Sequence, residues 1–518
     1  MRIAASTIVL LAAAGVAQSA FAQWGSSSTP TTLVSGANDQ VQPKCVPAPG
    51  GGFYMSWLDN RTPGYDPYVQ RFSALGAPIW PAPGVKVADT SFSSNEDYGF
   101  TVDGAGNAVI IFRDDRFGGV KVSAQAISPD GNLLWGANAI QLSASTSINA
   151  PNATTGTDGA VYAGWTESSK ARVMRLNADG TPAWGAAYAM TDGSSATYFL
   201  SDLQPGDNGS VIVSGVRYTT FTGAKFIHLQ KLSTAGATMW PTPTVPAYTT
   251  GSIQTANFPA FLPDGAGGAI VPFYKINPLQ CYVQWINSAG VVQFGADATA
   301  VTATTTGKER TNPSVARDPA TNLIYVDWYE HVPNTSNYGI FAQCFNSAGA
   351  RQWGADGVAV KPIETVYSYD QPRALVLDGK PVFMWVRSTA FGQSMASAWG
   401  FNTNGTAYWP APTDLRSAPG STARLASLNY PDNNSAVVYW EDGAIGNTEI
   451  VGQRLNKNGA LGNPAGNPAD LDNSGVVDGT DLGILLGSWG PCAGCPADLN
   501  GDGVVDGTDL GLLLGSWS

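Results

Sequence analysis

One short pattern recurs along most of this chain and limits the folds that are open to it. A turn of the form Asn/Ser-x-x-Gly is followed, four residues after its glycine, by an aromatic residue. The glycines are Gly76, Gly131, Gly180, Gly236, Gly290, Gly349 and Gly405, and the aromatic residues are Trp80, Trp135, Trp184, Trp240, Phe294, Trp353 and Trp409. Successive aromatic residues stand 49 to 59 residues apart. A repeat of this length fits one propeller blade, with four short strands and their loops.

The eighth copy of the pattern is divided between the two ends of this region. Gly459 is followed four residues later by Asn463, whereas Trp24 has no turn before it and stands 56 residues before Trp80. A strand supplied by the N-terminus would complete the last blade and leave no open sheet edge. We therefore predict an all-β, eight-bladed propeller over residues 23–462 that is closed by its N-terminal strand. A seven-bladed ring stays open as an alternative if one unit is irregular.

The composition supports a fold of short strands and tight turns. Charged residues make up only 13% of the chain, whereas it contains 60 glycines and 34 prolines. The formal net charge is −12, and the eight aspartates between residues 470 and 509 contribute −8 of it. Because the chain has no basic stripe, we exclude nucleic acid as a partner.

Near the end of each predicted second strand, every unit carries a charged residue. The eight are Asp59, Asp114, Glu167, Arg217, Lys275, Glu330, Arg387 and Asp442. Equivalent positions in a propeller would form a ring on one face, where a ligand could bind. The favoured interpretation is structural, because a position repeated in every unit usually serves the fold. Such charges could simply form local ion pairs at the surface, which contribute little to stability. The repeated tryptophans are likewise interpreted as wedges between blades rather than as sugar-binding platforms.

The sequence does not select catalytic residues. A glycosidase needs two carboxylates that face each other across the sugar bond, and the predicted ring, Glu96–Asp97 or Glu441–Asp442 could supply them. The two histidines, His228 and His331, fall in different units. A Ser-His-Asp triad or a zinc site built on several histidines is therefore poorly supported.

The last part of the chain holds one sequence twice, beginning at residues 470 and 498. Each copy places oxygen-bearing side chains at loop positions 1, 3, 5, 9 and 12 and glycine at position 6, the spacing with which a 12-residue loop wraps a calcium ion. Position 7 contributes a backbone carbonyl. The predicted ligands are Asp470, Asp472, Ser474, Val476, Asp478 and Asp481 in the first loop, and Asp498, Asn500, Asp502, Val504, Asp506 and Asp509 in the second. We expect weaker binding in the first loop, because Ser474 stands where a carboxylate or an amide is usual.

Each loop is followed by a short predicted helix with one apolar face. The face consists of Leu482, Leu485, Leu486 and Trp489 after the first loop, and of Leu510, Leu513, Leu514 and Trp517 after the second. We expect the two faces to pack on each other, because neither could be buried alone.

A duplicated loop and helix with Asp, not Glu, at position 12 resembles a type I dockerin module, and the resemblance covers about the last 50 residues. It implies calcium in both loops and docking onto a cohesin-like module of a scaffold or cell-surface anchor. It also implies association with secreted enzymes that degrade polysaccharides. The helices lack the Lys-Arg pair that many cohesin-binding dockerins carry, so an unfamiliar cohesin or a role as an attachment tag stays open.

Two of the five cysteines lie between the duplicated units. Cys492 and Cys495 resemble those of a cysteine-containing variant of the module, and a small disulfide is favoured over a zinc half-site because no second ligand pair is near. Cys45, Cys281 and Cys344 are expected to be buried, small apolar residues.

The N-terminus predicts export. Met1-Arg2, an apolar run from Ile8 to Val16 and the small residues Ala20 and Ala22 indicate a signal peptide over residues 1–22. No later run is long enough for a membrane-spanning helix. The predicted domains are the signal peptide (1–22), the propeller (23–462), a linker (463–469) and the calcium-binding module (470–518). We expect a secreted bacterial protein, free outside the cell or attached to its surface by the tail.

These observations favour one function and leave a second open. In the first, the tail binds calcium and anchors a propeller that binds a glycan or a protein. In the alternative, the propeller is itself a polysaccharide-degrading hydrolase or lyase. This alternative rests on the resemblance to dockerins, which most often occur on such enzymes, and not on the fold.

Overall fold

The computed structural model describes residues 24–517 apart from 94–95, 241–242, 391, 464–468, 473–476, 493–494 and 501–502. The predicted signal peptide over residues 1–22 and most of the predicted linker lie outside this range. No helix in the described part of the chain is long and apolar enough to cross a membrane.

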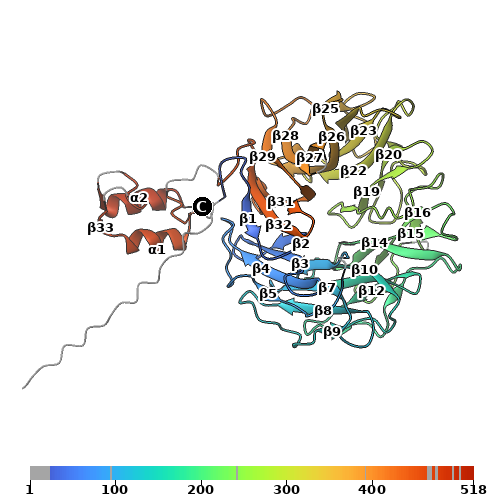
Figure 1. Ribbon diagram of the computed structural model, residues 1–518, viewed down its shortest axis with the longest axis horizontal. Coiled ribbons are helices and arrows are strands. Elements are labelled where there is room, and N and C mark those ends of the chain that lie inside the picture. Colours follow the sequence, from blue (N-terminus) through green and yellow to red (C-terminus); the bar gives the residue numbers. More distant parts are fainter. Residues whose placement is uncertain are drawn as a thin grey trace, which may run out of the picture.

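Eight four-stranded antiparallel sheets surround a common centre (Figure 1). Blade 1 contains β2 (Gln40–Pro47), β3 (Phe53–Asp59), β4 (Asp66–Phe72) and β5 (Val85–Lys86). Blade 2 contains β6 (Gly99–Val102), β7 (Ala108–Asp114), β8 (Lys121–Ile127) and β9 (Ile140–Gln141). Blade 3 contains β10 (Ile148–Thr155), β11 (Val161–Glu167), β12 (Lys170–Arg175) and β13 (Tyr188–Ala189). Blade 4 contains β14 (Thr197–Pro205), β15 (Val211–Tyr218), β16 (Phe226–Leu232) and β17 (Val245–Pro246).

The second half of the ring follows the same plan. Blade 5 contains β18 (Leu262–Pro263), β19 (Ala269–Lys275), β20 (Gln280–Ile286) and β21 (Thr299–Ala300). Blade 6 contains β22 (Glu309–Arg317), β23 (Ile324–His331), β24 (Tyr338–Phe345) and β25 (Val358–Glu364). Blade 7 contains β26 (Ser368–Leu377), β27 (Lys380–Ala390), β28 (Gln393–Gly400) and β29 (Thr413–Gly420). Blade 8 contains β30 (Thr422–Asn429), β31 (Ser435–Ala444), β32 (Asn447–Asn456) and the N-terminal strand β1 (Thr31–Val34).

The chain closes the ring as the divided repeat predicted. β1 pairs antiparallel with β32, so the N-terminal strand is the outer strand of blade 8. Trp24 lies buried in the apolar cluster between blades 8 and 1. The prediction of an eight-bladed propeller closed by the N-terminal strand is confirmed, and the seven-bladed alternative is wrong.

The repeated aromatic residues join neighbouring blades. Each tryptophan of the pattern donates its indole N–H to a backbone carbonyl in the turn of the next blade, at distances of 2.8 to 3.1 Å. The glycine of that next turn adopts φ between 76° and 85°. A Cβ atom added to any of these eight glycines would lie 2.4 to 3.4 Å from the aromatic ring of the preceding blade. Glycine is therefore required twice over, by its backbone conformation and by the ring that covers it.

A buried glutamine holds the aromatic residue in most blades. Five glutamines of the third strands accept a hydrogen bond from the backbone N–H of the aromatic residue ten positions later, at 2.9 to 3.3 Å. They are Gln70, Gln125, Gln230, Gln284 and Gln343. Each is 3% exposed or less, so these hydrogen bonds satisfy polar groups that water cannot reach.

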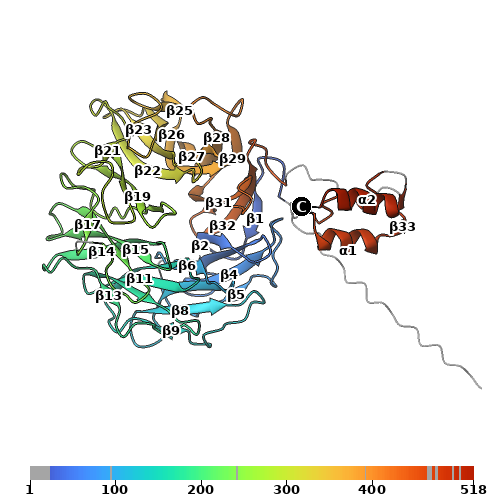
Figure 2. The ribbon, with the colours of Figure 1, turned by 180° about the vertical axis from the view of Figure 1, so that it is seen from behind.

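The tail forms a separate small core outside the ring (Figure 1 and Figure 2). It contains α1 (Gly479–Gly487), β33 (Gly490–Pro491), β34 (Val504–Val505) and α2 (Gly507–Gly515). Leu485 and Leu513 are fully buried in this core, together with small apolar residues of the loops. The expectation that each helix buries four apolar residues is wrong. Leu486 and Leu514 remain 51% exposed on the helices, and Trp489 and Trp517 remain 51% and 46% exposed because each helix ends before its tryptophan.

The contact between blades predicts the effect of a single methyl group. Gly180→Ala places Cβ 2.4 Å from the ring of Trp135, whereas Gly193 has a similar φ of 83° with no atom within 4 Å of its Cβ position. We expect Gly193→Ala to cost about 1–2 kcal/mol of unfolding free energy from backbone strain alone. Gly180→Ala should cost about 1–3 kcal/mol more from overpacking. Thermal or urea unfolding measures both, and equal losses would contradict the contact.

Candidate functional site

The described part of the first tail loop gathers carboxylates as a calcium loop would. Oxygen atoms of Asp470, Asp472 and Asp481 all lie within 4.8 Å of one another. Asp481 is fully buried, and its carboxylate accepts hydrogen bonds from the backbone N–H groups of Asp472 and Asp478, both at 2.9 Å. No lysine or arginine occurs in the tail to offset these charges. The donor set is therefore hard oxygen, which fits Ca²⁺.

The second loop has the same local construction. Asp509 is buried and accepts from the backbone N–H groups of Leu499, Asn500 and Asp506, at 2.8, 3.1 and 2.9 Å. These hydrogen bonds, that of Asp506 above all, lower the pKa of Asp509. The N–H of Gly503, at φ 90°, donates to the Asp498 carboxylate at 2.8 Å and turns the loop inward. Ser474, Val476 and Asp502 lie outside the described residues, so three of the twelve predicted ligands stay predictions without a position.

A disulfide joins Cys492 to Cys495, with Cα atoms 5.6 Å apart. It lies next to the short pairing of β33 with β34, and the N–H of Cys492 donates to the Gly503 carbonyl at 2.9 Å. The bridge thus fixes the segment that leads into the second loop. Cys45, Cys281 and Cys344 are free thiols. Cys281 and Cys344 are buried as expected, whereas Cys45 is only partly buried, and loss of solvation raises the pKa of each.

The predicted ring of charges is occupied by local interactions. Seven of its eight members form ion pairs: six with residues of their own blade or of the segment that leads into it, and Asp442 of blade 8 with a residue of β29 in blade 7. The pairs are Asp59 with Arg61, Asp114 with Arg116, Glu167 with Arg172, Arg217 with Asp192, Glu330 with Lys308 and Arg310, Arg387 with Asp414, and Asp442 with Arg416. The ammonium group of Lys275 instead lies 4.8 Å and 4.5 Å from the ring centres of Tyr248 and Tyr282. These contacts support the structural interpretation of the ring.

The other candidate acids are also engaged in structural contacts. Glu96 pairs with Arg113, and Asp97 pairs with Lys44 at 2.8 Å. Glu441 accepts from the Gln42 backbone N–H at 2.6 Å and pairs with Arg424 at 2.9 Å, so it links blade 8 to blade 1.

The two histidines stay apart in the structure. Burial lowers the pKa of His228 to about 4, and its ring lies 3.0 Å from the Thr244 hydroxyl. His331 lies 3.1 Å from Glu309. Neither arrangement is a catalytic triad.

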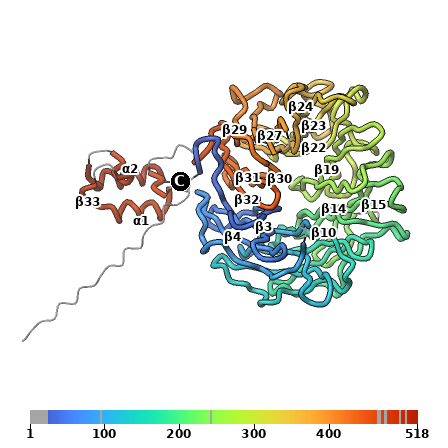
Figure 3. The backbone as a smooth tube through the Cα atoms, viewed as in Figure 1, coloured from blue at the N-terminus to red at the C-terminus, as the bar shows by residue number. Residues whose placement is uncertain are grey.

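A cavity of about 560 Å³ opens beside blade 5, where the repeat is broken. The first strand of most blades has eight to ten residues and lies near the centre of the ring (Figure 3), but β18 has only two. Between β17 and β18 the chain instead follows an irregular path through residues 247–261. β18 pairs only with Ala269 and Ile270 of β19, so the stretch from Pro272 to Tyr274 lines the cavity without a neighbouring inner strand. Proline at 272 suits this position because it has no N–H to leave unpaired.

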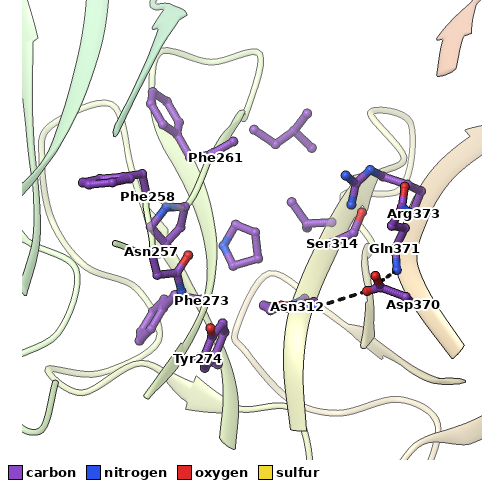
Figure 4. A pocket seen from close by; sticks show the side chains of 16 residues that line it. Asn257, Phe258, Phe261, Phe273, Tyr274, Asn312, Ser314, Asp370, Gln371 and Arg373 are labelled. Carbon is purple, nitrogen blue, oxygen red and sulfur yellow. Dashed lines mark hydrogen bonds between the residues drawn. The ribbon is translucent and has the colours of Figure 1, made fainter. Parts of the chain in front are cut away.

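One wall of the cavity is aromatic. Figure 4 shows Phe258, Phe261, Phe273 and Tyr274 on the side of blade 5. Phe258 is 40% exposed and stacks on Phe199 of β14, with ring centres 4.6 Å apart. One face of Phe258 is thus supported by the protein while the side chain remains accessible. The Tyr274 hydroxyl donates to Gln254 at 2.7 Å, which fixes that ring as well.

The opposite wall is polar and comes from β22 and β26. Each strand has a register shift, between Thr311 and Ser314 in β22 and between Asp370 and Arg373 in β26. At each shift a non-glycine residue with positive φ precedes a proline: Asn312 at 53° and Gln371 at 52°. The same bulge recurs in β2 at Gln42, in β10 at Ala150 and in β30 at Arg424, so it belongs to the repeat, and its effect is to redirect side chains. Here they bring amide groups to the cavity (Figure 4).

The cavity has two charged lining residues of opposite sign. Asp370 accepts from the Gln371 backbone N–H at 2.7 Å and from the Asn312 amide at 3.4 Å. Arg373 donates through Nε to the Leu425 carbonyl at 3.0 Å and through Nη1 to the Pro372 carbonyl at 2.9 Å. Among the described residues that line the cavity, Asp370 is the only carboxylate.

A second carboxyl group lies behind the polar wall. Asp327 of β23 is fully buried, and neither of its oxygen atoms has a hydrogen-bond partner of good geometry. Burial raises the pKa of Asp327 well above its usual range, although the charge of Arg373 opposes the change. The neutral acid is the stable form there, because a buried, unpaired carboxylate is costly.

The residues of this cavity were missed by reasoning from the sequence. Two signals were available: the long stretch without a strand pattern before Leu262, and Pro272 inside an otherwise regular strand. Asn312 and Gln371 are each followed by proline in the sequence, but spacing alone does not reveal the bulges.

Comparisons with known proteins leave the family of this chain open. No family model matches it, and no curated protein matches it. Among solved structures it is similar to an ulvanlyase described as a new family of polysaccharide lyase (11% identity; 83% of this chain and 96% of that chain; TM-score 0.45). It is also similar to an alpha-L-arabinanase of Penicillium chrysogenum complexed with arabinobiose (14%; 60% and 93%; 0.33) and to the Dos1 propeller (10%; 82% and 95%; 0.43). At these identities and scores, neither ligand nor activity is transferred to this chain.

The buried acid behind the cavity wall gives a pH-dependent prediction. The folded state keeps the Asp327 proton above the unfolded pKa of about 3.9, so this residue makes the wild type lose stability as pH rises. Asp327→Asn cannot ionise, so the melting temperature of this variant should rise relative to that of the wild type as pH increases above about 4. Asp432→Asn, in an exposed turn, is the control. A loss of stability in Asp327→Asn at neutral pH would mean that the carboxylate is ionised and paired with Arg373.

Proposed function

We propose that this chain is a secreted, calcium-anchored carbohydrate-binding protein whose propeller holds a glycan in the cavity between blades 5, 6 and 7. The observation that carries the proposal is the pair of facing walls: an aromatic wall with one accessible, supported ring, Phe258, on one side, and amides with a guanidinium group on the other.

The two walls match the two kinds of surface on a sugar. A pyranose or furanose ring offers a face of C–H groups, which packs on an aromatic ring, and hydroxyl groups at its edge. The hydroxyl groups can both donate and accept, as can the side-chain amides of Asn257, Asn312 and Gln371. Binding sites for small ligands typically combine apolar walls with a few placed polar groups.

Binding is favoured over cleavage because the cavity offers one accessible carboxylate. Hydrolysis of a glycosidic bond by the common mechanisms uses two carboxyl groups on either side of the bond. Asp370 faces the cavity, whereas Asp327 is fully buried behind the wall and does not line it. Cleavage remains the alternative function, and release of reducing ends or of unsaturated uronates that is lost in Asp370→Asn would establish it.

The proposed role of the tail is attachment. Its gathered carboxylates and its resemblance to a type I dockerin support calcium in two loops, with a cohesin-like module or a cell-surface anchor as the partner. When bound, calcium would supply the positive charge that lets the buried carboxylates of Asp481 and Asp509 lie among other acids. Secretion follows in this proposal from the predicted signal peptide.

Phe258 provides the direct test of glycan binding. Removing its ring in Phe258→Ala should weaken binding of the preferred polysaccharide about tenfold or more, because the stacking surface is lost. Phe221→Ala removes an aromatic ring that is 71% exposed and outside the cavity, and it should leave the affinity unchanged. Isothermal titration calorimetry of the full chain against plant, algal and bacterial polysaccharides measures both. Equal affinities for the two variants would show that the polysaccharide does not bind at Phe258.

Calcium removal tests the tail. Chelation should expose residues 470–517 to protease and reduce the helical circular dichroism signal, while the melting of the propeller stays unchanged. Asp498→Ala combined with Asp509→Ala should have the same effect on the second unit, because both carboxylates leave the loop. The exposed Asp130→Ala is the control. If chelation changes neither protease resistance nor helicity, the calcium loops are wrongly assigned.

A further inference from the structure

The guanidinium group of Arg373 is held in a fixed orientation at the cavity wall, and it forms no ion pair with a described residue. Its Nε and one Nη1 N–H are fixed by the carbonyls of Leu425 in blade 8 and of Pro372. A guanidinium group has five N–H bonds, so two fixed bonds leave three for a ligand. The side chain is exposed at the cavity wall, and Figure 4 shows it beside Ser314 and across from the aromatic side chains.

No carboxylate in the described part of the chain neutralises this group by a direct ion pair. Arginines of the charged ring, such as Arg217 and Arg387, pair with an aspartate at 2.8 and 3.0 Å. The Asp370 carboxylate is instead engaged by Asn312 and Gln371 and forms no ion pair with Arg373 within 4 Å. Asp327, buried behind the wall, forms no ion pair with Arg373 within 4 Å, and burial raises the pKa of Asp327 well above its usual range.

The anchoring of Arg373 has a consequence for selectivity. Fixing a guanidinium fork before a ligand arrives removes much of the entropy cost of ordering it on binding. The fork matches the planar pair of oxygens of a carboxylate, or two oxygens of a sulfate ester, through two parallel hydrogen bonds. A neutral hydroxyl group would use one of these bonds and none of the charge.

We propose that Arg373 recognises the acidic group of an anionic sugar residue, a uronate or a sulfated sugar, while Phe258 supports the ring of the same chain. This inference rests on the proposed carbohydrate-binding function and narrows its ligand to acidic polysaccharides. Asn312 and Gln371 then contact hydroxyl groups near the acidic one.

The test compares acidic polymers with their neutral partners on the full chain. The probes are polygalacturonate with its methyl ester, chondroitin with its methyl ester, and a sulfated galactan with its desulfated form. The wild type should bind at least one acidic member and bind its neutral partner roughly ten- to a hundredfold more weakly. A preference confined to the first two pairs identifies a carboxylate, and one confined to the third identifies a sulfate ester.

Arginine variants separate recognition from structure. Arg373→Gln should abolish the preference for the acidic member, and Arg373→Lys should keep part of it because the charge remains without the fork. The wild-type affinity should fall with added salt while that of Arg373→Gln stays nearly constant. Arg71→Gln is the matched control, because Arg71 is also held by two backbone carbonyls but lies outside the cavity.

The two proposals fail in different ways. If the wild type binds only neutral polysaccharides, or if Arg373→Gln keeps the acidic preference, the inference about Arg373 is overturned while carbohydrate binding stands. If the wild type binds no polysaccharide of either kind, the proposed function is overturned and this inference with it.

Discussion

The ring depends on one contact that is made eight times: an aromatic side chain of one blade lies on the turn glycine of the next. With seven tryptophans the contact combines apolar packing and an indole hydrogen bond to the backbone, whereas Phe294 contributes packing alone, and no blade can form the contact by itself. Because each blade supplies an aromatic residue to one neighbour and a glycine to the other, a linear array would leave one of each unmatched. Trp24 and Gly76 make the final match and thereby close the circle.

This contact also explains what the sequence could and could not predict. Spacing alone identified eight units and the displaced Trp24, since both are properties of the chain order. The same spacing placed glycine and tryptophan in one unit, and their contact runs between adjacent units instead. Gly180, for example, meets Trp135 and not Trp184. Periodicity counts repeats, but it does not show which neighbour a side chain faces.

The cavity could not be predicted from the sequence for a related reason, because it arises where the chain departs from the repeat. β18 is cut to two residues, and Pro272 follows in a strand that lacks an inner neighbour there. Each departure is visible as an irregular unit, but only the fold shows that the gap faces the bulges at Asn312 and Gln371. Conversely, the charged residues at the most regularly repeated position mostly form ion pairs within the protein. In this chain, regularity marks structure and irregularity marks the candidate site.

The net charge of −12 at first argues against an acidic ligand. Its distribution weakens the objection, since −8 belongs to the tail and the rest of the chain carries only −4. At physiological ionic strength, charges more than about 8 Å away are largely screened. The cavity therefore responds to its nearest groups. Burial raises the pKa of Asp327 and so disfavours its negative charge, and the Asp370 carboxylate accepts hydrogen bonds within its own bulge instead of pairing with Arg373. Among the described residues that line the cavity, the guanidinium group of Arg373 is the one positive charge that a bound sugar would meet.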